Sequence, residues 1–358
     1  MACRGQVAHR PLSCLDRRDA CDVPLIPKHG VLDMLHQTLP APIETYPSEH
    51  PEIAWKDGRI VPWADCTLHV RMQAGFFGAN IFEGLRAYWN ADEERMYVFR
   101  LDDHLVRLEQ SMRIMRMTPP FSRHELGDAV LELFQRTDFR GHGQANLVTY
   151  FGFPPPGDPV SHAAPSGAHI TAVPMGRSPA AKTGLTAGVS SWRRLSDDTM
   201  PIRVKIGSNY QNSRLAQNEV RAGGYDMALL LNRAGKLAEA PGACLFILRD
   251  GVLITPPTNA DILESITRDT VLTFARQELG LTVIEREVDR SEAYIADEVF
   301  ICGSIAEILP LTSIDGIEIG DGQPGAVTRD LQELYFQTVE ARLPRYAAWC
   351  TAVPAPAG

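Results

Sequence analysis

Lys205 is the residue whose surroundings point most directly to chemistry. It lies in the run Arg-Val-Lys-Ile-Gly-Ser-Asn-Tyr, in which small residues follow the lysine and Tyr210 stands five positions on. A lysine amine that is desolvated or close to other cations loses its proton near neutral pH and can then attack a carbonyl group. The small residues would let a ring approach the backbone, and the Tyr210 hydroxyl could bond to that ring. From composition alone, a lysine in a surface loop is the simpler explanation.

Three further runs would complete a site for an anionic, ring-shaped cofactor. Glu239, in Lys-Leu-Ala-Glu-Ala-Pro-Gly, could face a ring nitrogen and keep it protonated. The run Ser265-Ile266-Thr267 opens a predicted helix, whose free N–H groups and dipole favour a phosphate group. Ser304, in Gly-Ser-Ile-Ala-Glu, follows a predicted buried strand and could meet the same phosphate. The ordinary alternatives are a solvated glutamate at a strand end, a helix cap and a turn.

The elements that must position these residues mix strands and helices irregularly. In the first half, we predict a hairpin from about Ile53 around an Asp57-Gly58 turn, and strands at 82–90, 96–101, 145–152 and 168–174. One helix should begin at the cap Asp102 and end before Pro119, and another should open with a capping box of Ser122 and Glu125. The small, polar residues 175–184 are predicted to be an interdomain linker.

The second half is predicted to follow the same mixed pattern. We expect strands at 185–192, 225–231, 243–249, 251–254, 281–288 and 298–302, and a strand or turn at 203–206. Helices are predicted at 213–222, 267–279 and 291–296, with a last one from about residue 328. Because strands and helices do not alternate strictly, the chain is not predicted to form a doubly wound sheet.

Composition narrows the class of protein. The chain has 358 residues, 44% hydrophobic and 22% charged, which is typical of a globular protein with room for two domains. Its formal charge of −9 argues against nucleic acid or an anionic membrane as a partner. No stretch is long and apolar enough to span a membrane, and the polar start does not resemble a signal peptide. Seven scattered cysteines without a CxxC pair indicate neither a zinc site nor a disulfide framework, so a cytoplasmic location is expected.

The order and spacing of these runs resemble the fold-type IV pyridoxal-phosphate (PLP) enzymes, and within them the branched-chain aminotransferases. The matching runs lie at residues 80–86 (Asn-Ile-Phe-Glu-Gly-Leu-Arg), 104–108, 190–192, 205–210, 266–269 and 296–300. The resemblance extends from about residue 52 to about residue 335. It implies an α/β fold of the α+β type, with a small α/β domain and a larger barrel-like domain that hold PLP at their interface.

The same resemblance implies a domain division, an assembly and a reaction. We expect an N-terminal extension at 1–45, partly disordered or laid over a partner subunit, a small domain at 46–174, the linker at 175–184, a large PLP-binding domain at 185–345 and a tail at 346–358. The chain should form a homodimer. It should transfer amino groups between an apolar amino acid, such as a branched-chain one, and a 2-oxo acid by a ping-pong mechanism.

Residue roles also follow from the resemblance. Lys205 resembles the catalytic Schiff-base lysine and general base. The implied PLP contacts are Tyr210 at the ring hydroxyl, Glu239 at the pyridine nitrogen, and Arg107, Ile266, Thr267 and Ser304 at the phosphate. The implied substrate-pocket residues are Phe77, Phe82, Gly84, Arg86, Ile305 and Ala306. No metal is expected.

Several positions depart from the family pattern, and most of them concern the substrate. Phe77 replaces a usual pocket tyrosine, and Asn146 and Val148 replace a tyrosine and an arginine that help to bind substrate carboxylates. We therefore predict that glutamate is a poor amino donor unless Arg86, Arg177 or Arg203 substitutes for the missing cation. Alternatives are a D-amino-acid or (R)-amine transaminase, a lyase resembling aminodeoxychorismate lyase, and a PLP-binding protein without activity.

Overall fold

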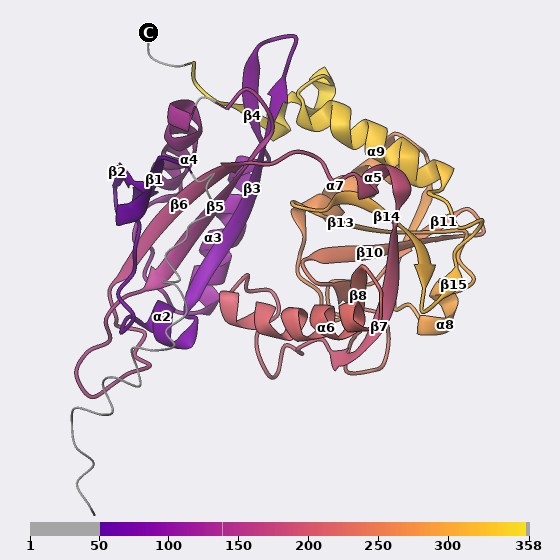
Figure 1. Cartoon of the computed structure of the whole chain (residues 1–358), viewed down its shortest axis with the longest axis horizontal. Helices are drawn as coiled ribbons and strands as arrows, with labels where there is room; N and C mark the ends of the chain where they lie inside the picture. Colours follow the sequence, from indigo (N-terminus) through magenta and orange to yellow (C-terminus); the bar gives the residue numbers. More distant parts are fainter. Residues whose placement is uncertain (1–50, 138, 356–358) are drawn as a thin grey trace, which may run out of the picture. The chain divides into compact units, whose positions relative to one another are not determined.

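Two β-sheets organise the part of the chain that the computed structural model describes, residues 51–137 and 139–355 (Figure 1). These residues belong to one compact unit. The expected N-terminal extension at 1–45 lies outside the described residues. Within the described part, no helix is long and apolar enough to cross a membrane, and no cluster of acidic, histidine or cysteine side chains could hold a metal ion.

The first sheet has seven strands in the order β16-β4-β3-β5-β6-β1-β2, and all neighbours are antiparallel. Its strands are β1 (Ile53–Lys56), β2 (Arg59–Pro62), β3 (Asn80–Asn90), β4 (Arg95–Phe99), β5 (Gly143–Phe151), β6 (Ser166–Pro174) and β16 (Cys350–Ala352). The predicted hairpin is confirmed, since Asp57 and Gly58 join β1 to β2 with positive φ angles of 46° and 93°.

Helices α3 (Leu101–Ile114) and α4 (Arg123–Thr137) pack an apolar face on this sheet, and the short helix α2 (Gln73–Phe77) precedes β3. The predicted capping box of α4 is confirmed, because the Ser122 and Glu125 side chains each accept a hydrogen bond from the other residue's backbone N–H. The predicted Asp102 cap of α3 is wrong. The N-cap is Arg100, whose φ of 51° is left-handed.

The second sheet has nine strands, with the main order β12-β11-β10-β13-β14-β7-β8. These are β7 (Leu185–Arg193), β8 (Met227–Leu231), β9 (Glu239–Ala240), β10 (Ala243–Arg249), β11 (Val252–Thr255), β12 (Thr282–Glu285), β13 (Glu298–Gly303), β14 (Glu307–Ile314) and β15 (Ile317–Glu318). Leu237 forms single bridges to Leu231, at the end of β8, and to Val288, beyond β12. These bridges link the two ends of the sheet, which confirms a barrel-like arrangement.

The helices around the second sheet are α5 (Ala180–Thr183), α6 (Tyr210–Ala222), α7 (Ile266–Gln277), α8 (Arg290–Ala293) and α9 (Ala326–Val339). The described residues also form the 3-10 turns η1 (Trp63–Asp65), η2 (Gly207–Asn209) and η3 (Pro344–Trp349). Helix α6 begins at Tyr210, three residues earlier than predicted. Helix α5 occupies part of the predicted linker. Residues 203–206 form a turn rather than a strand, and strand β14 was not predicted.

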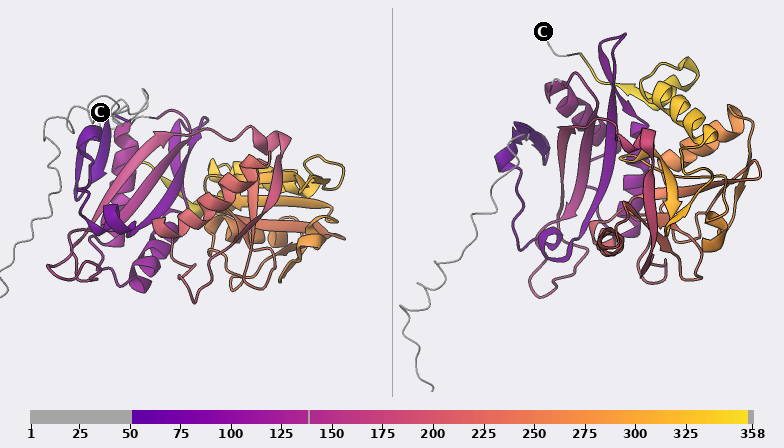
Figure 2. Two further views of the ribbon diagram at one scale, coloured as in Figure 1. Left: turned by 60° about the horizontal axis from the view of Figure 1, so that its bottom comes forward. Right: turned by 45° about the vertical axis from the view of Figure 1, so that its right-hand side comes forward.

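The C-terminal segment, predicted to be a tail at 346–358, contributes a strand to the first sheet. Strand β16 pairs with β4 of the first sheet, and the Val353 N–H donates to Met96 O over 2.9 Å. In both views of Figure 2, the chain leaves α9 and returns to the sheet that carries β4. A tail was predicted because three residues are too few to show the alternation of a strand, and the open edge of β4 supplies the missing hydrogen-bond partners.

Candidate active site

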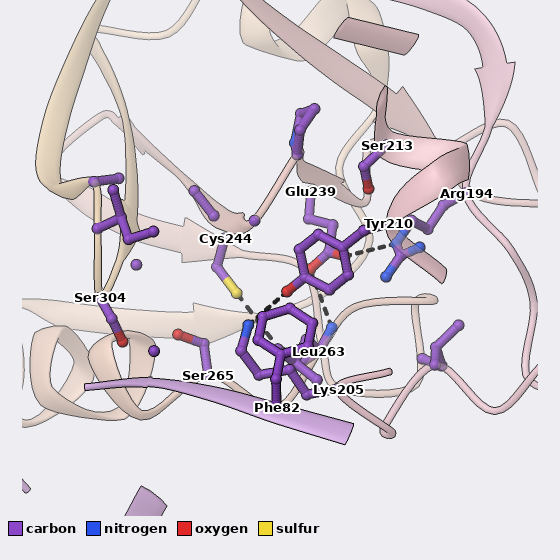
Figure 3. A pocket seen from close by; sticks show the side chains of 18 of the residues that line it. Phe82, Arg194, Lys205, Tyr210, Ser213, Glu239, Cys244, Leu263, Ser265 and Ser304 are labelled. Carbon is purple, nitrogen blue, oxygen red and sulfur yellow. Dashed lines mark hydrogen bonds and ion pairs between the residues drawn. The ribbon is translucent and has the colours of Figure 1, made fainter. Parts of the chain in front are cut away.

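Residues from both sheets line a cavity of about 390 Å³ (Figure 3). The first sheet contributes residues of β3 and β5. The second half of the chain contributes the 202–205 turn, α6, the β9–β10 connection, residues before α7 and the turn after β13. The predicted site residues in this lining are Arg107, Lys205, Tyr210, Glu239, Ser304, Phe82, Gly84, Ile305 and Ala306.

Lys205 is held by its backbone, while its side chain extends into the cavity. The Phe82 N–H donates to Lys205 O over 2.9 Å, and Ile206 forms a bridge to Ile81. Lys205 Nζ donates to Tyr210 Oη over 2.5 Å and lies 4.6 Å from the centre of the Phe82 ring. The amine therefore has a defined place between a phenol and an aromatic face.

Tyr210 is the first residue of α6, and its ring packs edge-on against Phe82 at 4.9 Å between centroids. The small residue Gly207, two positions after Lys205, was predicted to make room for a bound ring, but the structure gives another reason for its size. A Cβ on Gly207 would lie 2.6 Å from Asn80 Oδ1, and Gly207 does not line the cavity. Its size therefore accommodates the Asn80 side chain, which lets β3 approach η2, rather than a bound ring.

Glu239 is a buried carboxylate with two donors. Arg194 Nε lies 2.6 Å from Oε1, and the Leu263 N–H donates to Oε2 over 3.0 Å (Figure 3). Arg194 Nη1 is also buried and has no hydrogen-bond partner. Sequence reasoning did not single out Arg194, although it lies two residues after the matching run at 190–192. The sequence around Arg194 does not indicate its ion-pair partner, because Glu239 is 45 residues away.

Arg107, the predicted phosphate contact, lies on α3, and three of its guanidinium N–H groups bind the protein. Its Nε and Nη2 donate to the two Glu83 oxygens over 2.8 and 2.6 Å, and Nη1 donates to Glu264 O over 2.8 Å. His104 Nδ1 lies 2.8 Å from Glu83 Oε2. These bonds use three of the five guanidinium N–H groups, so the remaining N–H groups could meet an anion.

The charge of this cluster is set by burial and pairing. Burial raises the pKa of Glu83, but Arg107 and His104 together outweigh it and lower that pKa to about 2. Burial lowers the pKa of His104. At neutral pH, Glu83 is therefore anionic beside the Arg107 cation. Glu83 and His104 lie in the family-matching runs at 80–86 and 104–108, but neither was predicted to belong to the site.

The start of α7 faces the cavity through Ser265, which caps the helix by accepting the Arg268 N–H over 3.2 Å. Ile266 and Thr267 are buried first-turn residues, whose N–H groups have no acceptor within the helix. Ile266 lines a neighbouring hollow that shares Arg107 and Ser265 with the cavity, and Thr267 lines neither. Ser304 lies at the same end, with its hydroxyl turned toward Ser265 (Figure 3).

Two of the predicted substrate residues lie outside the lining. Phe77 is 45% exposed at the end of α2. Arg86 is 2% exposed, and its guanidinium lies 3.7 Å from Glu307 and 3.4 Å from Gly176 O. The strand β3 places Phe82, Gly84 and Arg86 on one face, but only the first two reach the cavity.

The three arginines that could have bound the distal carboxylate of glutamate lie outside the cavity lining, and each is close to a glutamate, although Arg86 Nε and Nη1 are buried without a hydrogen-bond partner. Arg177 pairs with Glu340 over 2.6 Å, and Arg203 pairs with Glu264 over 3.0 Å. Arg203 was expected beside Lys205 if the segment were extended, but the turn at 203–206 directs its side chain to Glu264. In the described lining, the arginines are Arg107 and Arg194, each paired with a glutamate.

Asn146 and Val148, which replace the family's carboxylate-binding tyrosine and arginine, are both uncharged. Asn146 lines the cavity, and its Oδ1 accepts from Gln144 Nε2 over 3.0 Å. This bond leaves the Asn146 amide N–H groups free to donate. Cys244 is another neutral lining residue, because burial raises the pKa of its thiol to about 12.

A barrel-like sheet beside a smaller antiparallel sheet, with a lysine and a buried carboxylate in one cavity, is the arrangement expected of a fold-type IV PLP enzyme. Comparisons with known proteins agree. Residues 80–314 match the family described as "Amino-transferase class IV". The "Probable branched-chain-amino-acid aminotransferase" of Aquifex aeolicus is 38% identical over 302 residues, which covers 84% of this chain and 97% of the relative.

Solved structures give the same result. The branched-chain amino acid aminotransferase of Thermobaculum terrenum in its PLP form is 42% identical, with a TM-score of 0.79, and the match covers 86% of this chain and 99% of that one. The T.th. enzyme, complexed with N-(5'-phosphopyridoxyl)-L-glutamate, is 35% identical, with a TM-score of 0.80 and coverage of 85% and 99%. The chain belongs to the class IV aminotransferase family, and the predictions of a PLP-dependent aminotransferase and of its fold are confirmed.

Proposed function

We propose that this protein transfers an amino group between a branched-chain or other apolar amino acid and a 2-oxo acid, by a ping-pong mechanism in which Lys205 moves the proton. The observation that carries this proposal is the Lys205 amine, which donates to Tyr210 over 2.5 Å in the cavity that also contains Glu239. A base, a phenol and a buried carboxylate in one cavity match the needs of transamination.

The residues present fit PLP. Glu239 would face the pyridine nitrogen, and Tyr210 the ring hydroxyl. The phosphate would be held by the start of α7 with Ile266 and Thr267, by Ser304, and by the remaining N–H groups of Arg107. The unpartnered Arg194 Nη1, buried in the lining, is a polar atom that a bound group would satisfy.

The chain's own contribution is to place one mobile amine. When bound, PLP supplies an aldehyde carbon that takes the amino group and a ring that withdraws electrons from the substrate's α-carbon. Because the Lys205 backbone is fixed to β3, only its side chain moves. The Lys205 amine removes the α-carbon proton and delivers it again, while its hydrogen bond to the Tyr210 hydroxyl keeps it within reach.

The apolar part of the lining supports an apolar side chain on the substrate. Its larger members include Phe82, Ile202, Val204, Met227, Leu263, Leu309 and Ile305. Burial of aliphatic groups against such a wall is favourable at about 25 cal/mol per Å². The relatives named above are branched-chain aminotransferases, which favours this class over the D-amino-acid, amine and lyase alternatives.

We also propose that glutamate is a poor donor. The T.th. relative was solved with a glutamate adduct, but here the lining offers Asn146 where the family carries a tyrosine, and Val148 follows on the same face of β5. A carboxylate that enters this cavity would meet arginines whose positive charges are already balanced by Glu83 and Glu239. Its desolvation would therefore be poorly compensated.

We further propose a homodimer that works in the cytoplasm. Exposed apolar side chains gather on and near α2 and on the β5–β6 loop: Val70, Phe76, Phe77, Phe153 and Val160. The two segments are in contact, because the Gln73 N–H donates to Gly152 O and His69 packs on Phe153. Such a patch is typical of an interface. The described cysteines are free, which suits a reducing compartment.

The proposed domain division, 46–174 and 185–345 joined by 175–184, is supported by the separate sheets on either side of residues 175–184. Limited proteolysis that cuts first within this segment would support that division, and first cleavage inside either sheet would contradict it.

The decisive experiment compares Lys205→Ala with Lys236→Ala, a lysine that pairs with Asp289 at the surface. Lys205→Ala should abolish transfer from leucine to a 2-oxo acid and remove the PLP absorbance that borohydride bleaches. Lys236→Ala should keep both properties. If Lys205→Ala still transfers the amino group, Lys205 is not the catalytic base.

A further inference from the structure

Arg100 joins the first turns of two helices. As the N-cap of α3, it donates from Nε to Asp103 over 2.6 Å. Its Nη1 lies 2.6 Å from Asp269 Oδ2, 3.3 Å from Ile266 O and 3.2 Å from Thr270 Oγ1, all within the first five residues of α7. One guanidinium therefore ties the end of β4 to the helix start that faces the cavity.

The C-terminal segment holds this arginine in place. The Arg100 N–H donates to Trp349 O over 2.6 Å, and the guanidinium lies 4.9 Å from the Trp349 ring centre. Trp349 stacks on Tyr346 at 4.6 Å, and Tyr346 packs against Phe274 of α7 at 5.2 Å. Only 10% of the Arg100 side chain is exposed. The segment before β16 thus braces both Arg100 and the middle of α7.

We propose that Arg100 and Trp349 are positioning residues for the phosphate group of PLP, acting through the first turn of α7. The inference rests on the proposed phosphate site at Ile266 and Thr267. Neither residue needs to touch the cofactor. Arg100 fixes the carbonyl of Ile266, and this contact sets the direction in which the first N–H groups of α7 point.

The charge of Arg100 is a second reason to expect that this residue supports phosphate binding. Asp269 lies in the first turn of α7, where its carboxylate would repel a phosphate dianion bound at the same helix end. Arg100 neutralises that carboxylate over 2.6 Å. Arg107, two turns further along α3, holds Glu264 O just before the helix. The two arginines therefore secure the backbone on both sides of Ser265.

The test separates the phosphate from the rest of the cofactor. The full-length chain, freed of PLP, is titrated with PLP and with pyridoxal, which lacks the phosphate, and binding is followed by tryptophan fluorescence. Arg100→Gln should weaken PLP binding about tenfold and pyridoxal binding by less than about twofold. Trp349→Ala should act in the same direction. Arg100→Gln with Asp269→Asn should recover part of the loss, because the unpaired carboxylate is gone.

The matched control is Arg345→Gln. Arg345 also lies in the C-terminal segment and binds Glu278 with two hydrogen bonds, but at the other end of α7. It should leave both affinities unchanged. Equal losses of PLP and pyridoxal binding in Arg100→Gln would overturn the inference, since a general effect on folding has no preference for the phosphate.

A further variant, Thr267→Ala, distinguishes an incorrect role for Arg100 from an incorrect location of the phosphate site. Thr267→Ala should weaken PLP binding and spare pyridoxal binding. If it does so while Arg100→Gln does not, the phosphate site stands and the role of Arg100 is wrong. If Thr267→Ala makes no distinction, the phosphate lies elsewhere and the inference falls with it.

Discussion

Arg194 and Glu239 form a buried ion pair, with 2.6 Å between Nε and Oε1 and 6% exposure for each side chain. Arg194 directly follows β7, and its side chain reaches the Glu239 carboxylate in the cavity. The Leu263 N–H holds the other Glu239 oxygen over 3.0 Å. The carboxylate therefore cannot rotate away from the cavity without losing two donors.

Glu239→Gln should still bind PLP but lose most of its activity, because an amide cannot hold the ring nitrogen protonated. We expect proton transfer to slow by about 100-fold or more, measured as the single-turnover rate with leucine. Glu287→Gln, a change at an exposed glutamate, is the control. An unchanged single-turnover rate in Glu239→Gln would place the ring nitrogen away from Glu239.

Arg194→Ala should destabilise the fold, because it leaves the Glu239 carboxylate buried without its cation. Removal of one partner of such a pair costs about 3–5 kcal/mol, measured by urea unfolding. The adjacent Arg193→Ala, at an exposed residue, should change the free energy of unfolding by less than about 0.5 kcal/mol. Adding Glu239→Gln to Arg194→Ala should restore stability, and strict additivity of the two changes would contradict the coupling.

The stability of the fold should depend on pH through Glu83. Its pKa is about 2 in the folded chain, against an ordinary value of 4.5, because Arg107 and His104 outweigh burial. The unfolded chain therefore binds this proton more readily as the pH falls. The stabilisation is complete above about pH 4.5, amounts to about 3 kcal/mol, and is lost as the pH falls toward 2.

Glu83→Gln should remove that part of the pH dependence. Urea unfolding of both proteins between pH 3 and 6 gives the comparison, and the wild-type free energy should fall more steeply with acid. Parallel profiles would show that Glu83 takes up its proton equally in the folded and unfolded chains.

The relative activity with glutamate and leucine as amino donors tests most directly the effect of the uncharged residues Asn146 and Val148. We expect kcat/KM for glutamate to be at least about tenfold below that for leucine, since desolvation of an unpaired carboxylate costs several kcal/mol. Asn146→Tyr with Val148→Arg should raise the glutamate value relative to leucine, because Val148 pairs with the cavity residue Phe82 in the β3–β5 register. Glutamate use equal to leucine use in the wild type would contradict the proposal.

Sequence reasoning was most successful where function and local structure use the same residues. The run from Lys205 to Tyr210 and the Ser265 cap of α7 are short stretches that match the family pattern, and all three residues line the cavity. The Asp57-Gly58 hairpin was equally accessible, because two left-handed residues need the side chains that tolerate them.

The sequence did not predict ion pairs between residues that are far apart in the chain. Glu83 and Arg107 are 24 residues apart, and Arg194 and Glu239 are 45 apart. No periodicity connects such pairs. Strand β14 was missed because Pro310 interrupts the run, yet Pro310 is tolerated opposite Phe300 inside the sheet. Arg86 was assigned to the pocket from the family resemblance, but the lining of the cavity includes Gly84 and not Arg86, whose guanidinium lies 3.7 Å from Glu307.

The late pairing of β16 with β4 affects how the protein is made. Strand β4 ends at Phe99 and its neighbour begins at Cys350, so about 250 residues are synthesised between the two. At ribosomal speeds this interval lasts roughly 10 to 50 seconds. Throughout it, the nascent first sheet presents a strand edge that other chains can pair with. Slow translation or shortage of chaperones should therefore cause aggregation through β4, although in the finished protein that edge is closed.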